Sequence, residues 1–336
     1  MAASPGSAMT APAGVVAVDI GGTKIAVALV DDAGVVHQRV DVATPRGGSA
    51  ILCVVAELVA GVCSRAAVRA VGVGAPGVID PVTGAVRSAT DILPGWAGTP
   101  VRERLAARLG LPVAVANDVR AAALGAAHSA DVREHRDILH VSVGTGIGGA
   151  LIRDRRMVTG PHAVTGEIAH LLVPATGAVA CGCGRFDHLE AVAAGPAIAA
   201  AIAGAAGAAA VARAAAIAGT AGAARGSVLP LDRVAGLPEA RAIIGAAASV
   251  LGRTLAGLVA AVDVDAITLG GGVVLGIPEF AGVVRDAFQA EALPPLRTVP
   301  VLVPAAGPDA PLLGAAHLAR RILADPVPAP RMEARA

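Results

Sequence analysis

Two cysteines and two histidines gather in one stretch near the middle of the chain, between residues 166 and 190. Two thiolates and two imidazoles form a donor set that tetrahedral zinc prefers. The alternative is a pair of buried free thiols in an ordinary loop. Because two of the chain's four cysteines lie here, we predict a metal-binding loop with two carboxylates beside it. The predicted ligands are His170, Cys181, Cys183 and His188, and the carboxylates are Glu167 and Glu190.

Glycine-rich turns follow apolar runs at three places in the chain. In the first, which reads DIGGTK, Gly21 and Gly22 lie between two apolar runs and predict a β-hairpin. Glycines leave backbone N–H groups open to phosphate oxygens, and Asp19 at the mouth of the turn could hold magnesium through water. The alternative is an ordinary hairpin without a ligand. The other two turns lie in SVGTGIGG, residues 142–149, and in LGGGV, residues 269–273.

Other phosphate-binding motifs are missing or lack the right context. The Walker sequence G-x-x-x-x-G-K-[ST] is absent, so any phosphates would be held by the hairpin turns. Two matches to the dinucleotide fingerprint G-x-G-x-x-G begin at Gly72 and Gly144, but neither is followed by a predicted helix. An NAD-dependent oxidoreductase is therefore not supported. Three glycine turns spread along the chain instead imply two similar half-domains that grip one polyanion.

Asp118 stands where a predicted strand ends and a predicted helix begins. A carboxylate at the carboxyl end of a strand, facing a cleft, is placed for general-base chemistry. The alternative is that Asp118 only caps the helix that follows. The local sequence favours neither reading over the other.

The remaining pattern predicts the elements that must position these residues. We predict a buried strand at 70–79 that runs into a Pro-Gly turn, and we assign Trp96, the only tryptophan, to packing rather than to ligand binding. The predicted helices are 49–67, one that starts near Thr99-Pro100, the alanine-rich stretch 197–226, 239–262 and 310–323.

Length and composition limit the function classes. A chain of 336 residues exceeds the size that one core usually serves, so we expect two domains. The net charge of +1 excludes a basic footprint for nucleic acid, and Arg253 within the longest apolar helix argues against a membrane span. The first residues lack the features of a signal peptide, so we expect a cytoplasmic protein in which Cys53 and Cys63 form no disulfide.

Taken together, the motifs resemble those of the ROK family (repressor, open reading frame, kinase), which includes bacterial glucokinases and N-acetylhexosamine kinases. They occur in the family's order over nearly the whole chain. The matching segments are DIGGTK (19–24), GAPGVID (74–80), ND (117–118), SVGTGIGG (142–149), GEIAH (166–170), CGCGRFDHLE (181–190) and LGGGV (269–273).

The resemblance implies an α/β chain with the actin-like (ribonuclease H-like) sugar kinase fold, in which two α/β domains surround a cleft for ATP and sugar. The expected segments are a disordered leader 1–14, an N-terminal domain 15–118 plus about 306–324, a C-terminal domain 119–305 with the metal loop 166–190, and a disordered tail 325–336. A homodimer or homotetramer is common among relatives.

The resemblance also implies roles for the residues that match. Asp118 corresponds to the catalytic base that takes a proton from a sugar hydroxyl as it attacks the γ-phosphate of ATP. The expected sugar contacts are Gly77, Asp91, Asn117, Asp118, Glu167, His170 and Glu190. The expected contacts to ATP and Mg²⁺ are Asp19, Gly21, Gly22, Thr23, Lys24, Gly144, Thr145, Gly146, Gly270, Gly271 and Gly272. His170 is expected to bind a structural Zn²⁺ as well.

The chain departs from the family pattern at several positions. The family's zinc motif has a third cysteine where this chain has His188, and an imidazole is also a good zinc ligand. Loss of the metal is the alternative. Ile92 replaces a sugar-binding asparagine, for which Asp91 could substitute. Ala169 and Arg120 replace a glycine and an asparagine that are usual in relatives.

We therefore expect an ATP-dependent sugar kinase that phosphorylates the 6-hydroxyl of a hexose, with glucose as the first candidate. N-acetylmannosamine or N-acetylglucosamine is the alternative substrate. A non-catalytic sugar sensor is a remoter alternative, because Asp19, Asp118 and the glycine turns are all present. No room precedes the first phosphate motif for the DNA-binding domain of the family's repressors.

Overall fold

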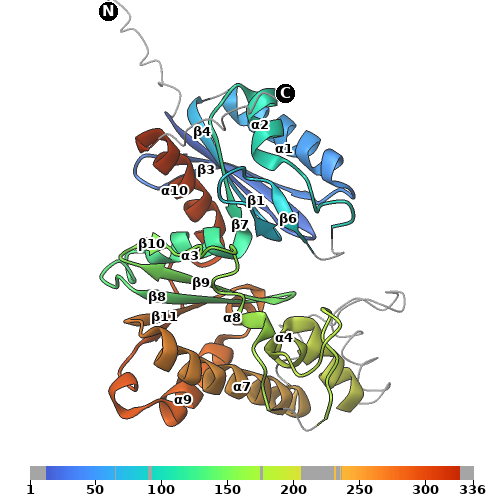
Figure 1. Cartoon of the computed structure of the whole chain (residues 1–336), viewed down its shortest axis with the longest axis vertical. Coiled ribbons are helices and arrows are strands. Elements are labelled where there is room, and N and C mark those ends of the chain that lie inside the picture. Colours follow the sequence, from blue (N-terminus) through green and yellow to red (C-terminus); the bar gives the residue numbers. More distant parts are fainter. Residues whose placement is uncertain are drawn as a thin grey trace, which may run out of the picture. The chain divides into compact units, whose positions relative to one another are not determined.

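The computed structural model describes residues 13–64, 66–89, 93–174, 177–205, 231, 235 and 237–325. The chain divides into two compact units. Unit 1 comprises Met1–Gly125 and Asp309–Ala336, and unit 2 comprises Ala126–Pro308. Each unit contains a five-stranded sheet with helices packed against it (Figure 1).

The sheet of unit 1 has the order β3-β2-β1-β4-β7. The first three strands are antiparallel neighbours, and β4 and β7 continue the sheet in parallel with β1. The strands are β1 (Ala13–Ile20), β2 (Lys24–Asp31), β3 (Val36–Ala43), β4 (Ala67–Ala75) and β7 (Val113–Asn117). Because the three parallel strands end at the same edge, the residues that follow them are brought together there.

Alternating side chains of β1 separate two apolar layers in unit 1. Val16 and Val18 pack with helices α1 (Gly48–Cys63) and α2 (Val101–Leu109), whereas Val15 and Ala17 pack with α10 (Ala310–Ala324) on the opposite face (Figure 1). Successive side chains of a strand point to opposite faces of the sheet, so both faces of β1 are apolar where helices cover both sides. Helix α10 thus brings the C-terminal part of the chain into the N-terminal unit.

A short two-stranded sheet and a tryptophan complete unit 1. Strands β5 (Val78–Ile79) and β6 (Val86–Ser88) pair with each other, and α3 (Asp118–Ala127) follows β7 directly. Trp96 is fully buried, and its indole N–H donates to the Pro76 carbonyl over 2.9 Å. The expected packing role of Trp96 is confirmed.

The sheet of unit 2 repeats the topology of unit 1, with the order β10-β9-β8-β11-β12. Its first three strands are again antiparallel, and β11 and β12 again continue in parallel. The strands are β8 (Ile138–Val143), β9 (Ile147–Arg153), β10 (Arg156–Met157), β11 (Ala266–Gly270) and β12 (Val301–Leu302). The two predicted hairpins, β1–β2 and β8–β9, are therefore the first strand pairs of the two sheets in chain order.

One long helix forms the centre of the unit 2 core. Leu251, Leu255 and Val259 of α7 (Pro238–Val262) are fully buried, and α7 packs along α9 (Pro278–Glu291). Among the described residues, α7 is long and apolar enough to cross a membrane. Core helices of soluble proteins meet the same criteria of length and composition. The shorter helices are α4 (Leu189–Ala193), Gly195–Ala205, α8 (Gly272–Gly276) and the 3₁₀ turns Ile168–His170 and Pro294–Leu296, with a third 3₁₀ turn, Gly307–Asp309, at the junction with unit 1.

Several predicted boundaries are wrong. The chain enters β1 at Ala13, inside the expected leader, and the expected helix 49–67 ends at Cys63, because β4 begins at Ala67. The expected strand 70–79 breaks after Ala75, since Gly77 takes φ +96° and turns the chain. Of the expected alanine-rich helix and the expected tail, residues 206–226 and 326–336 lie outside the described residues.

Candidate active site

The residues expected to do chemistry fall into two groups, one in each unit. Unit 1 holds Asp19, the turn 21–24, Gly77, Asn117 and Asp118, all near the carboxyl ends of β1, β4 and β7. Unit 2 holds the turns 144–146 and 270–272 together with Glu167, Glu190 and the metal loop. Asp91 lies outside the described residues.

The β1–β2 turn of unit 1 is closed by backbone and threonine hydrogen bonds. Gly21 N–H donates to the Lys24 carbonyl over 2.8 Å. Thr44 braces the turn twice, with its hydroxyl on the Gly21 carbonyl at 2.7 Å and its N–H on the Thr23 carbonyl at 3.0 Å. Gly22 and Thr23 are exposed, so the turn presents backbone groups to an incoming anion. Lys24 pairs with Asp41 over 3.2 Å while staying more than half exposed.

Asp19 and Asp118 lie on either side of Gly74. A Cβ at Gly74 would stand 3.6 Å from the Asp19 carboxylate and 3.5 Å from the Asp118 Cα atom. Burial, and then the charge of Asp118, raise the pKa of Asp19 to about 7. Two carboxylates in a partly buried position create a local excess of negative charge, which suits a divalent cation.

Asn117 connects the end of β7 to the turn after β4. Its side-chain N–H donates to the Gly77 carbonyl over 3.1 Å, and its side-chain oxygen accepts from the Arg120 N–H at 3.2 Å. The second bond caps the first turn of α3, and the Asp118 carboxylate also accepts the Val119 N–H over 2.9 Å, so both residues bond to the start of this helix. Gly77 has no room for a side chain, because a Cβ would lie 2.5 Å from the Ser88 carbonyl.

In unit 2 the two glycine turns lie side by side at the carboxyl edge of β8 and β11. The strands pair Ser142 with Gly270, and a Cβ at Gly271 would stand 2.4 Å from the Val143 carbonyl. Gly271 also takes φ +88°, which L side chains disfavour. The first turn is closed by the Gly144 N–H on the Gly146 carbonyl at 2.9 Å, which leaves Thr145 exposed at its tip. The fold of unit 2 therefore brings these two turns together.

Glu190 connects the metal loop to the first of these turns. Its carboxylate accepts the Ile147 N–H over 3.0 Å, and a Cβ at Gly146 would stand only 2.6 Å from the same carboxylate oxygen. A glycine at 146 is thus required for Glu190 to approach the backbone. The predicted ligand His188 directly precedes α4, and Glu190 is the second residue of that helix. The start of α4 therefore positions the Glu190 carboxylate.

The four predicted metal ligands form one cluster. Their donor atoms all lie within 4.8 Å of one another. His170 Nδ1 lies 3.3 Å from His188 Nδ1, and Cys183 Sγ lies 3.2 Å from the same His188 atom. Zinc–nitrogen bonds of about 2.0 Å and zinc–sulfur bonds of about 2.3 Å in a tetrahedron place ligand atoms about 3.3–3.8 Å apart. The donor set suits zinc, and the two measured pairs lie near these distances, although the cluster as a whole spreads to 4.8 Å.

Backbone bridges hold the metal loop in place. Leu172 and His188 form an isolated antiparallel bridge, and the Leu189 N–H donates to the Leu171 carbonyl over 2.9 Å. Burial raises the pKa of the Cys181 thiol, so this cysteine needs a cation beside it to ionise at neutral pH. Glu167 and His170 remain exposed on the adjoining 3₁₀ turn.

Sequence reasoning missed Thr44, Gly74 and Ile147. Thr44 acts on a turn 23 residues earlier, and Ile147 acts on a carboxylate 43 residues later. Gly74 reaches Asp19 only through the parallel pairing of β1 with β4. No local pattern carries such a signal. Only the folded chain brings these groups together.

Comparisons with known proteins identify the family to which the chain belongs. A family model described as ROK family matches residues 15–322. N-acetylmannosamine kinase from Pasteurella multocida is 39% identical over 189 residues, which are 55% of this chain and 61% of that relative. The chain thus spans less than two thirds of that enzyme. N-acetylmannosamine kinase from Yersinia pestis is 32% identical over 91% of this chain and 98% of its own length.

A solved structure matches to a similar extent. It is that of a ROK family glucokinase from Streptomyces griseus in complex with glucose and AMPPNP. The match covers 91% of this chain and 99% of that chain at 32% identity, with a TM-score of 0.79.

Proposed function

The chain belongs to the ROK family and has its actin-like fold, and from that premise we propose that it is an ATP-dependent sugar kinase. The reaction transfers the γ-phosphate of ATP to the 6-hydroxyl of a hexose. The observation that carries the proposal is the pair of carboxylates on either side of Gly74, at the edge where β1, β4 and β7 end.

Asp118 serves as the general base. Its carboxylate accepts the proton of the sugar hydroxyl as the oxygen forms its bond to the γ-phosphorus and the bond from phosphorus to the leaving ADP oxygen breaks. Phosphoryl transfer demands positioning and neutralisation of charge more than covalent chemistry. Asn117, fixed by Gly77 and Arg120, holds the backbone from which Asp118 acts.

Asp19 and the glycine turns serve the phosphates. Burial and the charge of Asp118 raise the pKa of Asp19 to about 7, and this carboxylate would hold Mg²⁺, which would supply charge neutralisation for the transferred group. Lys24 and the backbone of Gly21, Gly22 and Thr23 form the phosphate contact of unit 1. In unit 2 the corresponding contacts are Gly144, Thr145 and Gly146 for phosphate and Gly270, Gly271 and Gly272 for the adenosine end.

The metal loop supports the sugar contacts. A structural zinc held by His170, Cys181, Cys183 and His188 would fix the loop that carries Glu190. Glu167, His170 and Glu190 then present hydrogen-bonding groups to the sugar, together with Gly77, Asp91 and Asn117 of unit 1. A histidine has two ring nitrogens, so His170 can bind the metal through one and a hydroxyl through the other.

Glucose and N-acetylmannosamine are the two candidate sugars. The likeness to a glucokinase solved with glucose favours the first, and the full-length likeness to N-acetylmannosamine kinases favours the second. We place glucose first, because the expected contacts are all hydroxyl-binding groups. We further propose a cytoplasmic homodimer or homotetramer.

The test is a measurement of kcat/KM with ATP and Mg²⁺ across glucose, mannose, fructose, N-acetylmannosamine and N-acetylglucosamine. A kinase specific for glucose gives its highest value with glucose, and a preference for N-acetylmannosamine assigns the second candidate. If no sugar supports turnover while sugar binding persists, the chain is a sensor and the kinase proposal fails.

A further inference from the structure

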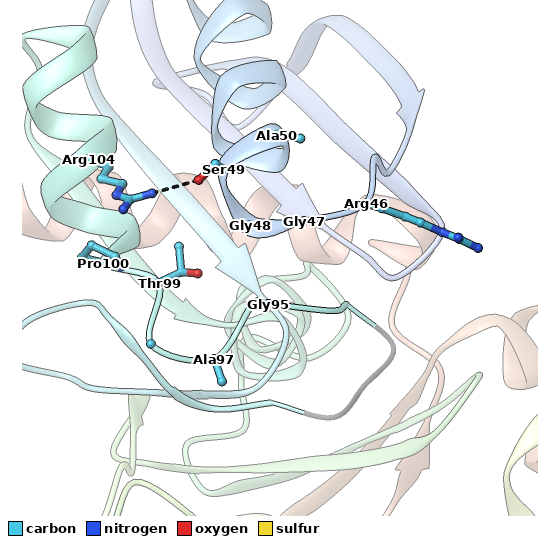
Figure 2. A pocket seen from close by; sticks show the side chains of 11 residues that line it. Arg46, Gly47, Gly48, Ser49, Ala50, Gly95, Ala97, Thr99, Pro100 and Arg104 are labelled. Atoms are coloured by element: carbon cyan, nitrogen blue, oxygen red, sulfur yellow. Dashed lines mark hydrogen bonds between the residues drawn. The ribbon is translucent and has the colours of Figure 1, made fainter.

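A cavity of about 470 Å³ lies at the beginning of α1 in unit 1 (Figure 2). None of its lining residues belongs to the groups assigned above to ATP, sugar or zinc. It is bounded by the chain before and within the first turn of α1 and by the loop that leads into α2. The polar side chains that line it are those of Arg46, Ser49, Thr99 and Arg104.

The charge of this cavity is entirely positive. Arg46 and Arg104 are its only ionisable lining residues. Figure 2 shows Arg104 reaching from α2 towards Ser49, whose hydroxyl it contacts at 3.2 Å, while Arg46 extends away from the other lining residues. The Arg104 guanidinium is therefore already directed across the mouth of the cavity.

Helix α1 adds unpaired donors. Its N-terminal cap is Gly47, which has no side chain to accept a hydrogen bond, and the first turn of α1 contains no acidic residue. The Ile51 N–H donates to the Gly47 carbonyl over 3.1 Å and is the first N–H of α1 with a helical hydrogen bond. The N–H groups of residues 48–50 carry the positive end of a helix of 16 residues.

A buried hydroxyl points to a ligand independently of the helix. Thr99 is only 6% exposed, yet its hydroxyl oxygen is not among the sealed, unpartnered atoms of the described residues, and no hydrogen bond links it to another described side chain. The hydroxyl oxygen faces the start of α1, since a Cβ on Gly48 would lie 2.7 Å from it (Figure 2). A hydroxyl that opens onto the cavity without a protein partner is free to donate to, or accept from, a polar occupant.

We propose that this cavity, the α1 pocket, binds the phosphate group of a small molecule. Backbone N–H groups at the start of α1, the Thr99 hydroxyl and the Arg104 guanidinium provide the hydrogen bonds. A helix N-terminus with an arginine and a hydroxyl is a donor set suited to a phosphate, and no carboxylate among the lining residues opposes the charge.

The volume of the cavity exceeds what a single phosphate ion fills, so the group can be carried by a larger molecule such as a phosphorylated sugar. The shared chemistry is the phosphate, and its source is either inorganic phosphate or a sugar phosphate. The inference is independent of the proposed kinase reaction, because it uses no residue of the proposed active site.

Calorimetric titration and thermal unfolding of the full-length protein test the proposal. Inorganic phosphate and glucose 6-phosphate are titrated separately at constant ionic strength, with the nucleotide site saturated by an ATP analogue. The key variants are Thr99→Val and Arg104→Gln. Thr99→Ser keeps the hydroxyl, and Arg108→Gln removes an arginine of the same helix that contacts Cys53 outside the cavity.

We expect at least one of the two ligands to bind and to raise the Tm, with binding weakened about tenfold or more by Thr99→Val and by Arg104→Gln but not by the two control variants. Without ligand, Thr99→Val should be about as stable as the wild type, because the hydroxyl that it removes opens onto the cavity. Stronger binding of glucose 6-phosphate would identify a sugar phosphate as the source, and equal binding would identify inorganic phosphate. Absence of binding, or binding that both key variants leave unchanged, would overturn the proposal.

Discussion

His140 is buried with a partner for only one of its two ring nitrogens. Nδ1 lies 2.9 Å from the Thr268 hydroxyl on the neighbouring strand, whereas Nε2 has no partner within the described residues. A Cβ at Gly270 would stand 3.2 Å from the ring. Burial lowers the pKa of His140 to about 4, so the ring is neutral at pH 7.

This burial predicts a pH dependence of stability. The unfolded chain binds a proton at His140 near pH 6.5, and the folded chain binds it only near pH 4. The unfolded state therefore holds more protons between these values, and stability falls as the pH drops through this window. Replacing His140 by Asn removes the titration and can keep the hydrogen bond to Thr268.

Urea unfolding at pH 7 and pH 4 measures this effect. The wild type should lose about 3 kcal/mol more than His140→Asn between the two values. Equal losses in His140→Asn and wild type would contradict a neutral buried His140.

The sequence identified most of the chemical groups but not their neighbours. Asp19, Asp118 and the metal ligands could be named because their types and local spacing are unusual. The position of Gly74 between the two aspartates could not be predicted from the sequence, because it depends on parallel pairing between β1 and β4. The local sequence also allows Asp118 a helix-capping role, and in the structure the Arg120 N–H donates to Asn117 while the Val119 N–H donates to Asp118.

Among the elements, the loop from Leu171 to Glu190 carries the clearest functional arrangement. His188 is both a predicted metal ligand and the residue before α4, and Glu190 contacts the Ile147 N–H. A metal that holds His188 thereby holds the start of α4. Positioning of Glu190 then depends on occupancy of the metal site.

Zinc content measures this dependence. Protein purified without chelator should contain about one zinc per chain by elemental analysis, and His188→Ala should lose it and unfold at lower temperature. His188→Cys, which restores a thiolate ligand, should retain the metal. Cys53→Ser serves as control, because Cys53 is exposed and outside the cluster.

Finding no zinc in the wild type would contradict the metal assignment directly. Finding zinc in His188→Ala at the level of the wild type would show that His188 is not a ligand.

Element types were more predictable from sequence than element ends. The hairpins and the helices after Pro100 and Pro238 follow from apolar periodicity and from proline placement. The break between Ala75 and Val78 was missed, because a run of valines and glycines reads as one strand until the positive φ of Gly77 is known. The 3₁₀ turn before the metal loop is too short for a periodic signal.

Taken as a whole, the chain builds the same strand order twice and returns to its first unit with its last helix. Helix α10 approaches the sheet of unit 1 so closely that a Cβ at Gly72 would lie 1.7 Å from the Ala315 carbonyl. Gly314 contacts the backbone of α3 in the same way, with a Cβ 1.6 Å from the Ala121 carbonyl. Glycines at these positions allow backbone-to-backbone packing.

A single added methyl tests this packing. Gly72→Ala should lower the free energy of unfolding by about 2 kcal/mol or more, because neither strand nor helix backbone can give way cheaply. Gly61→Ala is the matched control, since an added Cβ there meets nothing within 4 Å in the exposed part of α1. We expect Gly61→Ala to stabilise the protein by roughly 0.5–1 kcal/mol. Equal effects of the two variants in denaturant unfolding would contradict the packing described.

Replacement of Asp118 tests the kinase account most directly. Asp118→Asn should lower kcat for the preferred sugar by about 10²- to 10⁴-fold, because the general base is lost, while the Kd of the sugar changes little. Asp32→Asn is the control, since Asp32 is 67% exposed and pairs only with Arg69 among the ion pairs of the described residues. A normal kcat in Asp118→Asn would contradict the assignment of Asp118 as the base.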